Sequence, residues 1–197
     1  MNDPTLLTHD HSKLDALLAE AFSALAAGVA ERSHAAVDVF WARLAMHIRA
    51  EHLHLFPTVL GAIETAAQEK VARGGPSLEM ATSTVAQLQE DHDYFMRELA
   101  AAVKELRAVC NHERQDKTAA LREVEGKILA VSRRLQRHNE LEESQIYLWA
   151  VALLAPPEQA ALNGKIGCEL ANPPPRLRED IGSSARLGQD EGDVQGR

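Results

Sequence analysis

The chain carries one pattern of metal-binding residue types twice. In each copy a histidine precedes a glutamate by four residues, as His47 and Glu51 do in "HIRAEHLHLF" and as His138 and Glu142 do in "HNELEESQIY". Residues four apart lie on one face of an α-helix, so both side chains of a pair can reach the same site. Imidazole and carboxylate together suit iron and related first-row ions. The two pairs therefore predict a centre for transition-metal ions.

Each pair has an earlier companion histidine in an Asp-His dipeptide. His11 follows Asp10, and His92 follows Asp91, each at the start of a leucine-rich helical stretch. Four imidazoles and two carboxylates suit a pair of ions, with two histidines on each ion and a glutamate able to bridge them. The predicted ligands are His11, His47, Glu51, His92, His138 and Glu142.

The alternative to a metal site is a set of packed core histidines. A lone histidine on an apolar helix face is usually a hydrogen-bonded core residue. Here, however, each of four helices carries one, and neither Glu51 nor Glu142 has an obvious Arg or Lys on its own face. A buried carboxylate without a partner is strongly unfavourable. Metal ligation accounts for all six residues at once.

Several other residues have open roles. His54, seven residues after His47, is a candidate partner or substitute ligand. A ferritin-like plan needs Glu-x-x-His on two helices, but both such motifs of this chain lie in one stretch, which disfavours it. The remaining candidates are Asp10, Asp91 and Glu143 as surface residues or partners of the ligands, Tyr94 and Tyr147 as residues that tune the site, and His34, His52 and His112 as solvated histidines.

Apolar periodicity predicts the helices that must position these residues. Four long helical patterns are predicted: one over about 5–30, one that starts near Ser33 as a plausible N-cap, one over 77–110 and one over 116–154. A short helix follows over about 158–170. Pro57 should bend or interrupt the second helix and distort the preceding "LHLF". A distorted segment after Pro57 would bring Glu51 and His92 to one level. Short connections favour an all-α, antiparallel up-down four-helix bundle. We expect this domain to occupy 1–171, including the short C-terminal helix, and a disordered tail at 172–197.

Composition limits the class of protein. The chain has 197 residues, 45% hydrophobic and only 4% aromatic, which fits one helical domain rich in Ala and Leu. A formal net charge of -8 argues against nucleic acid and against anionic membranes as partners. Two cysteines form no disulfide framework, no secretory signal is visible, and no apolar stretch approaches the ~18 residues of a membrane span. We therefore expect a cytoplasmic protein, a monomer or a small homo-oligomer.

With these motifs in order, the sequence over roughly residues 5–155 resembles the hemerythrin-like, HHE cation-binding family. The resemblance rests on the two Asp-His dipeptides, on "HIRAEHLHLFP" and on "HNELEE". It implies a four-helix bundle that holds two iron ions in a non-haem centre, oxo- or hydroxo-bridged, with the six residues above as ligands. The implied function is binding or sensing of oxygen, nitric oxide or a related small ligand, in signalling, storage or stress response. A redox enzyme (peroxidase-like or for iron-centre repair) and an iron store are the alternatives.

The chain departs from the family's oxygen carriers at one position. Those proteins have two histidines one turn apart on the third helix, whereas the residues four away from His92 are Leu88 and Met96. One ligand is therefore missing. We expect such a centre to admit more exogenous ligands, or to react further, instead of carrying oxygen reversibly.

Overall fold

The computed structural model describes residues 5–68 and 75–173, and these residues form helices joined by short connections, with no strand among them. The elements are α1 (Thr5–Ala26), α2 (Ala30–Ala50), η1 (Glu51–Leu55), α3 (Phe56–Gln68), α4 (Leu78–Cys110), α5 (Lys117–Leu141), η2 (Glu142–Ile146), α6 (Tyr147–Leu153) and α7 (Pro156–Leu170). The label η marks a π-helical turn. Within the described part of the chain, no helix is both long enough and apolar enough to cross a membrane. The predicted tail lies outside the described residues, apart from 172 and 173.

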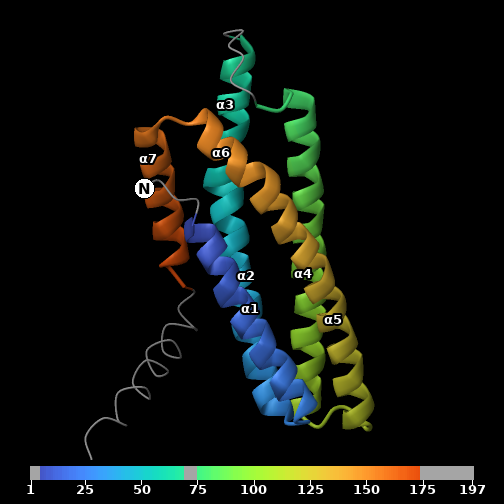
Figure 1. Cartoon of the computed structure of the whole chain (residues 1–197). Helices are drawn as coiled ribbons and strands as arrows, with labels where there is room; N and C mark the ends of the chain where they lie inside the picture. The colour runs from blue at the N-terminus through green and yellow to red at the C-terminus, as the bar shows by residue number, and fades with distance from the viewer. Residues whose placement is uncertain (1–4, 69–74, 174–197) are drawn as a thin grey trace, which may run out of the picture.

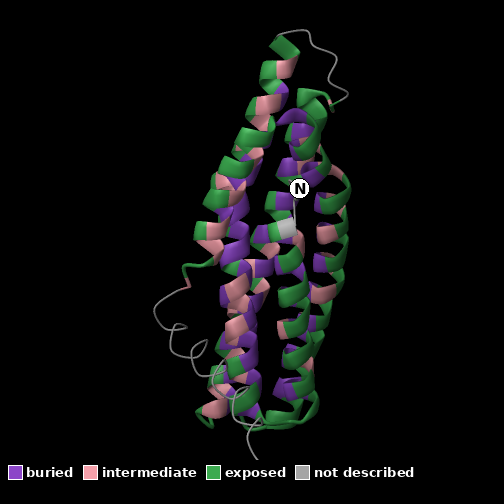
Figure 2. Ribbon diagram, turned by 60° about the vertical axis from the view of Figure 1, so that its left-hand side comes forward, coloured by how far each residue is buried: buried purple, intermediate pink, exposed green. Residues whose placement is uncertain are grey.

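The helices pack lengthwise in pairs. α1 packs against α2, and α4 packs against α5, with α2 also contacting α4 and α1 contacting α5. The α1–α2 and α4–α5 connections lie at one end of the molecule, and α3, α6 and the start of α4 lie at the other (Figure 1). α7 folds back along α2 and η1. Buried residues line the faces that the helices turn toward one another (Figure 2).

Two apolar clusters fill the interior, and the predicted ligands lie between them. One cluster contains Leu14, Leu44, Phe95 and Leu135 among others, and it fills the end with the short connections. The other contains residues such as Leu7, Leu55, Leu88 and Ile146. Each predicted ligand falls between these residues in the chain, so the polar side chains form one layer with apolar packing on both sides. Such packing keeps bulk water away from the layer and strengthens its electrostatic interactions.

Capping side chains mark where α4 and α5 begin. The side chain of Ser77 accepts a hydrogen bond from the Met80 amide, and that of Asp116 accepts one from the Ala119 amide, as N-caps do. The prediction for Ser33 was wrong, because α2 already begins at Ala30 and the Ser33 hydroxyl donates to the Val29 carbonyl inside the first turn.

Each of the two helices that carry a His-x3-Glu pair contains a π-turn, which begins at the glutamate. The Phe56 amide donates to the Glu51 carbonyl, and the Tyr147 amide donates to the Glu142 carbonyl, five residues back. The distortion expected in the "LHLF" before Pro57 is confirmed, since the π-turn covers 51–55, whereas the helix continues through the proline as α3 without the distortion expected after it. Since 142–146 contains no proline and has the same turn, proline cannot be the common cause. Turns of this kind occur often at functional sites.

Candidate metal centre

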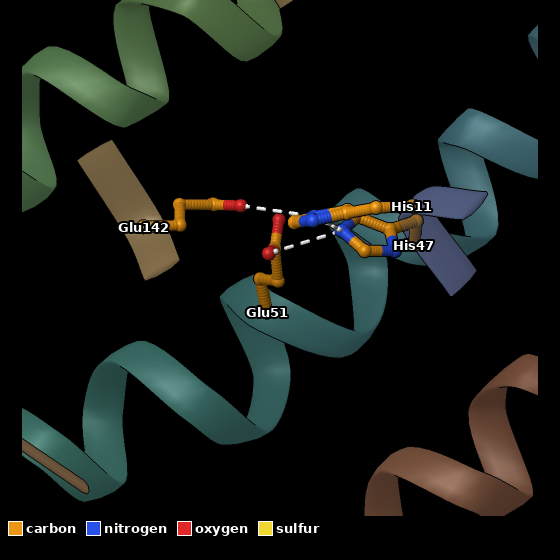
Figure 3. Close-up of side chains that lie close together, drawn as sticks. All are labelled: His11, His47, Glu51 and Glu142. Atoms are coloured by element: carbon orange, nitrogen blue, oxygen red, sulfur yellow. Dashed lines mark hydrogen bonds and ion pairs between the residues drawn. The ribbon is translucent and has the colours of Figure 1, made fainter. Parts of the chain in front are cut away.

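Six side chains that come from four helices meet in the polar layer. They form two groups of four that share both glutamates, and within each group the potential ligand atoms all lie within 4.8 Å of one another. The first position is His11, His47, Glu51 and Glu142 (Figure 3), and the second position is Glu51, His92, His138 and Glu142. All six residues are buried. The structure thus brings together every residue predicted as a ligand, and their binding of ions stays a prediction.

The first position has donor atoms at coordination spacing. His11 Nε2 lies 3.2 Å from His47 Nε2 and 3.3 Å from Glu142 Oε2, and His47 Nε2 lies 3.2 Å from Glu51 Oε1. Ligand atoms about 2.0–2.2 Å from one ion are separated by roughly 3 Å. Figure 3 shows both histidine rings and both carboxylates pointing toward the same point.

The second position repeats this geometry with the other two oxygens. His92 Nε2 lies 3.0 Å from His138 Nε2 and 3.3 Å from Glu51 Oε2, while His138 Nε2 lies 3.1 Å from Glu142 Oε1. Each glutamate therefore offers one oxygen to each position. Two ions held at these positions would share both carboxylates.

The outward-facing ring nitrogens explain why the inward-facing ones can bind a cation. Asp10 Oδ2 lies 3.0 Å from His47 Nδ1, Asp91 Oδ2 lies 3.3 Å from His138 Nδ1, and Glu143 Oε1 lies 2.8 Å from His11 Nδ1. A carboxylate needs a proton on that Nδ1, so a neutral ring presents a lone pair at Nε2. Carboxylate partners of this kind fix the tautomer and raise the basicity of a metal-binding histidine.

Two arginines hold these aspartates in turn. Arg43 donates to Asp10 Oδ1 and to the Leu170 carbonyl at the end of α7, and Arg134 donates to Asp91 Oδ1. Each arginine precedes its histidine by four residues, so the full pattern is Arg-x3-His-x3-Glu. This signal is not apparent from the faces of the glutamates alone, because both arginines contact the aspartates instead. Of the two roles predicted as alternatives for Asp10 and Asp91, surface residue or partner of a ligand, the structure shows the second, since both are buried and each lies beside a histidine.

His92 has a different partner from the other three histidines. His52 Nε2 lies 2.8 Å from His92 Nδ1. The prediction that His52 is solvated was therefore wrong: its side chain is half-buried and its ring packs against both His92 and Phe56. The error arose because helical periodicity places residue 52 outside the ligand face, and the π-turn that begins at Glu51 shifts that face.

The charges in the centre strongly perturb its titration when no ion is bound. Burial alone would lower the pKa of His47, but the carboxylates of Glu51 and Asp10 raise it to about 10. Burial would likewise lower the pKa of His138, but the carboxylates of Glu142 and Asp91 raise it to about 10. Burial would raise the pKa of Glu51, but His47 and His92 hold it well below its usual range. In the metal-free centre, protons on the histidines therefore supply the positive charge that bound ions would bring.

Protons on the histidines do not satisfy every carboxylate oxygen of the metal-free centre, because two buried oxygens have no hydrogen bond from any residue that the structure describes. Glu51 Oε2 and Glu142 Oε1 have no hydrogen-bond partner among the described residues, although a histidine nitrogen lies within 3.3 Å of each. Buried carboxylate oxygens without hydrogen bonds are unfavourable. An ion at each position would satisfy both of them, and this observation supports the fit of the six residues to metal.

Tyr147 joins the centre as a buried hydroxyl group. Its oxygen lies 3.3 Å from His11 Nε2, 3.3 Å from Glu142 Oε2 and 3.5 Å from Glu51 Oε1. Burial and the two nearby glutamates raise its pKa well above the ordinary tyrosine value. Tyr94, the other tyrosine of the chain, instead packs its ring under the guanidinium groups of Arg97 and Arg134.

The remaining candidates lie outside the centre. His54 faces Glu169 of α7 at 3.9 Å and belongs to neither ligand group. Leu88 is fully buried in one apolar cluster and Met96 packs against the other, so neither residue four places from His92 adds a ligand to either group. His112 is exposed at the α4–α5 turn, as expected, whereas His34 is only partly exposed.

The donor set defines what the centre can do. Four imidazole nitrogens and two shared carboxylates can hold two first-row ions close together, with coordination positions left for other ligands. A surface pocket of about 480 Å³ lies between α1 and α5, and His11 and Glu143 are among the residues that line it. Comparison of the chain with protein-family models, with curated proteins and with solved structures found no match.

Proposed function

We propose that the chain is a hemerythrin-like protein: an antiparallel up-down four-helix bundle whose centre holds two iron ions and binds oxygen, nitric oxide or a related small ligand. The observation that carries this proposal is the pair of four-residue groups that share Glu51 and Glu142. Two histidines on each side and two bridging carboxylates suit a pair of iron ions. The role would be sensing, storage or a response to oxidative or nitrosative stress.

Different residues of the chain would have different roles at such a centre. Glu51 and Glu142 would hold the two ions at a fixed separation, since each offers one oxygen to each position. Asp10 and Asp91 would keep the Nε2 lone pairs of their histidines directed inward. The apolar clusters above and below would exclude water. Bound iron would supply the affinity for a diatomic ligand.

The direct test is iron content after anaerobic reconstitution with ferrous iron, compared with zinc and manganese. We expect about two ions per chain, and sharply lower occupancy in His47→Ala and His138→Ala, because each removes a ligand. His112→Ala, an exposed histidine, is the matched control and should retain both ions. The reduced protein should then bind nitric oxide with a change in its visible spectrum. A reconstituted protein without iron would contradict the proposal.

One observation favours a redox enzyme as the second candidate. A buried tyrosine hydroxyl in contact with ligand atoms is a group that can take part in oxidation at the ions. Peroxide consumption by the iron-loaded protein, with a reducing co-substrate present, separates the two. Sustained turnover that Glu51→Ala abolishes would favour the enzyme, and a single stoichiometric oxidation would favour the binding protein.

A further inference from the structure

The centre is built from two equivalent halves. Each half supplies an Asp-His dipeptide from one helix and an Arg-x3-His-x3-Glu motif from the next. The equivalent pairs are Asp10 and Asp91, His11 and His92, Arg43 and Arg134, His47 and His138, and Glu51 and Glu142. Their contacts repeat as well: in each half the arginine and the histidine both bond the aspartate, and each glutamate faces the histidine four residues before it.

The equivalence fails at the residue five places after each glutamate. Tyr147 follows Glu142 at this spacing and stacks on the His11 ring, with ring centroids 5.9 Å apart and planes at 25°. Phe56 follows Glu51 at the same spacing and stacks on the His92 ring, at 6.0 Å and 12°. The two rings therefore occupy equivalent places, and only one of them carries a hydroxyl. That hydroxyl lies next to three ligand atoms of the first position.

A second difference lies at the residue directly after each glutamate, and it also gives the first position the stronger donors. Glu143 gives His11 a carboxylate partner, whereas His52 gives His92 an imidazole. A carboxylate partner raises the basicity of a metal-binding histidine more than a neutral partner does. The first position thus gains both an additional oxygen and a more strongly donating histidine. The second position has four donors and an aromatic ring without a polar group.

From these two differences we propose that Tyr147 closes the first position and that exogenous ligands bind at the second position, beside Phe56. The proposal rests on the proposed function, since both positions must hold iron. The Tyr147 oxygen would occupy the place that a small ligand needs at the first ion. The ion at the second position, with fewer and less basic donors, attracts small anions such as azide more strongly.

The test exchanges the hydroxyl between the two rings and uses azide as the probe. Iron content and circular dichroism are measured first for the unmodified protein, Tyr147→Phe, Phe56→Tyr and the double variant. Azide binding to the oxidised, iron-loaded proteins is then followed by visible absorption. The unmodified protein should bind one azide per two irons. Phe56→Tyr should weaken azide binding at least tenfold, and the double variant should recover it, because the open position has moved to the first ion.

Tyr147→Phe supplies an independent measurement that does not depend on adding a group to the core. It should bind azide at least as tightly as the unmodified protein, and its stoichiometry should rise to two per two irons. Loss of azide binding in Tyr147→Phe, or unchanged binding in a folded, iron-loaded Phe56→Tyr, would overturn the inference alone. Absence of iron from the unmodified protein would contradict the proposed function, and the inference with it.

Discussion

The Oδ2 atom of Asp10 lies 3.0 Å from Nδ1 of His47, and neither residue exposes more than 2% of its surface. Such a contact orients the imidazole before any ion arrives. Burial would raise the pKa of Asp10, but His47 and Arg43 lower it, so the carboxylate is ionised and able to accept the proton of the ring. Asp91 and His138 form the equivalent contact in the second half of the chain.

We therefore expect Asp10→Asn and Asp91→Asn each to weaken metal binding by roughly 10- to 100-fold, although neither aspartate is a proposed ligand. An asparagine can present its amide nitrogen to the ring and favour the wrong tautomer. Competition with a chromophoric chelator measures the change in affinity. Asp15→Asn, an exposed residue on the same helix as Asp10, is the control and should bind as the unmodified protein does. Equal affinities in all three variants would rule out the orienting role.

The ligand pattern was accessible from the sequence because helical spacing is regular. His47 and Glu51 lie one helical turn apart wherever the helix is placed, and four such apolar faces meet in only a few ways. The starts of two helices near 77 and 116 were predicted as well, and in the structure Ser77 and Asp116 cap these helices. All-helical structure among the described residues is confirmed. The domain boundary at 171 stays a prediction.

What the sequence left open depends on contacts between distant segments. A π-turn has no distinct residue pattern, so the place of His52 beside His92 could not be deduced from a periodicity of 3.6. Whether Asp10 is exposed or buried depends on Arg43, thirty-three residues away, and on how α1 and α2 are aligned. Tyr147 and His11 are 136 residues apart in the chain, and the packing of α1 beside α5 brings them together.

The residues after the two glutamates should set how strongly each position binds. Glu143→Gln removes the carboxylate partner of His11 and should weaken binding at the first position by roughly tenfold. His52→Glu should strengthen binding at the second position by a similar factor, because it gives His92 the partner that His11 already has. Stepwise metal titration followed by calorimetry measures both changes. Glu140→Gln, an exposed residue beside Glu143 in the same pocket, is the control.

The stability of the metal-free protein should depend on pH in a defined window. The carboxylates around His47 and His138 raise both histidine pKa values from 6.5 to about 10, despite burial. A raised pKa stabilises the fold fully below the unfolded value and loses this effect as pH rises through the folded value. The free energy of unfolding should therefore decrease between pH 6.5 and about 10. Urea denaturation across this range tests it, and a flat profile would contradict the charge assignment.

The metal-loaded protein should respond to pH in the opposite direction. An ion can bind His47 and His138 only after each has lost a proton, so binding at neutral pH should release one proton from each. Affinity should then rise with pH, and the difference in melting temperature between loaded and metal-free protein should grow from pH 6 toward pH 9. Proton release in a weakly buffered solution containing an indicator dye measures this directly. Metal binding without proton release would show that both histidines are already neutral.

Helix α7 should contribute substantially to the stability of the fold. Ile166 is 2% exposed and packs with Leu162 into the apolar cluster beside η1 and α3, while Arg43 bonds the Leu170 carbonyl at the helix end. Ile166→Ala leaves a cavity there and should lower the free energy of unfolding by about 2–5 kcal/mol. Leu129→Ala, at a residue that is 40% exposed, should cost much less and serves as the matched control. Urea denaturation of the metal-free proteins separates the packing effect from metal binding, and equal destabilisation by both substitutions would show that α7 does not pack as described.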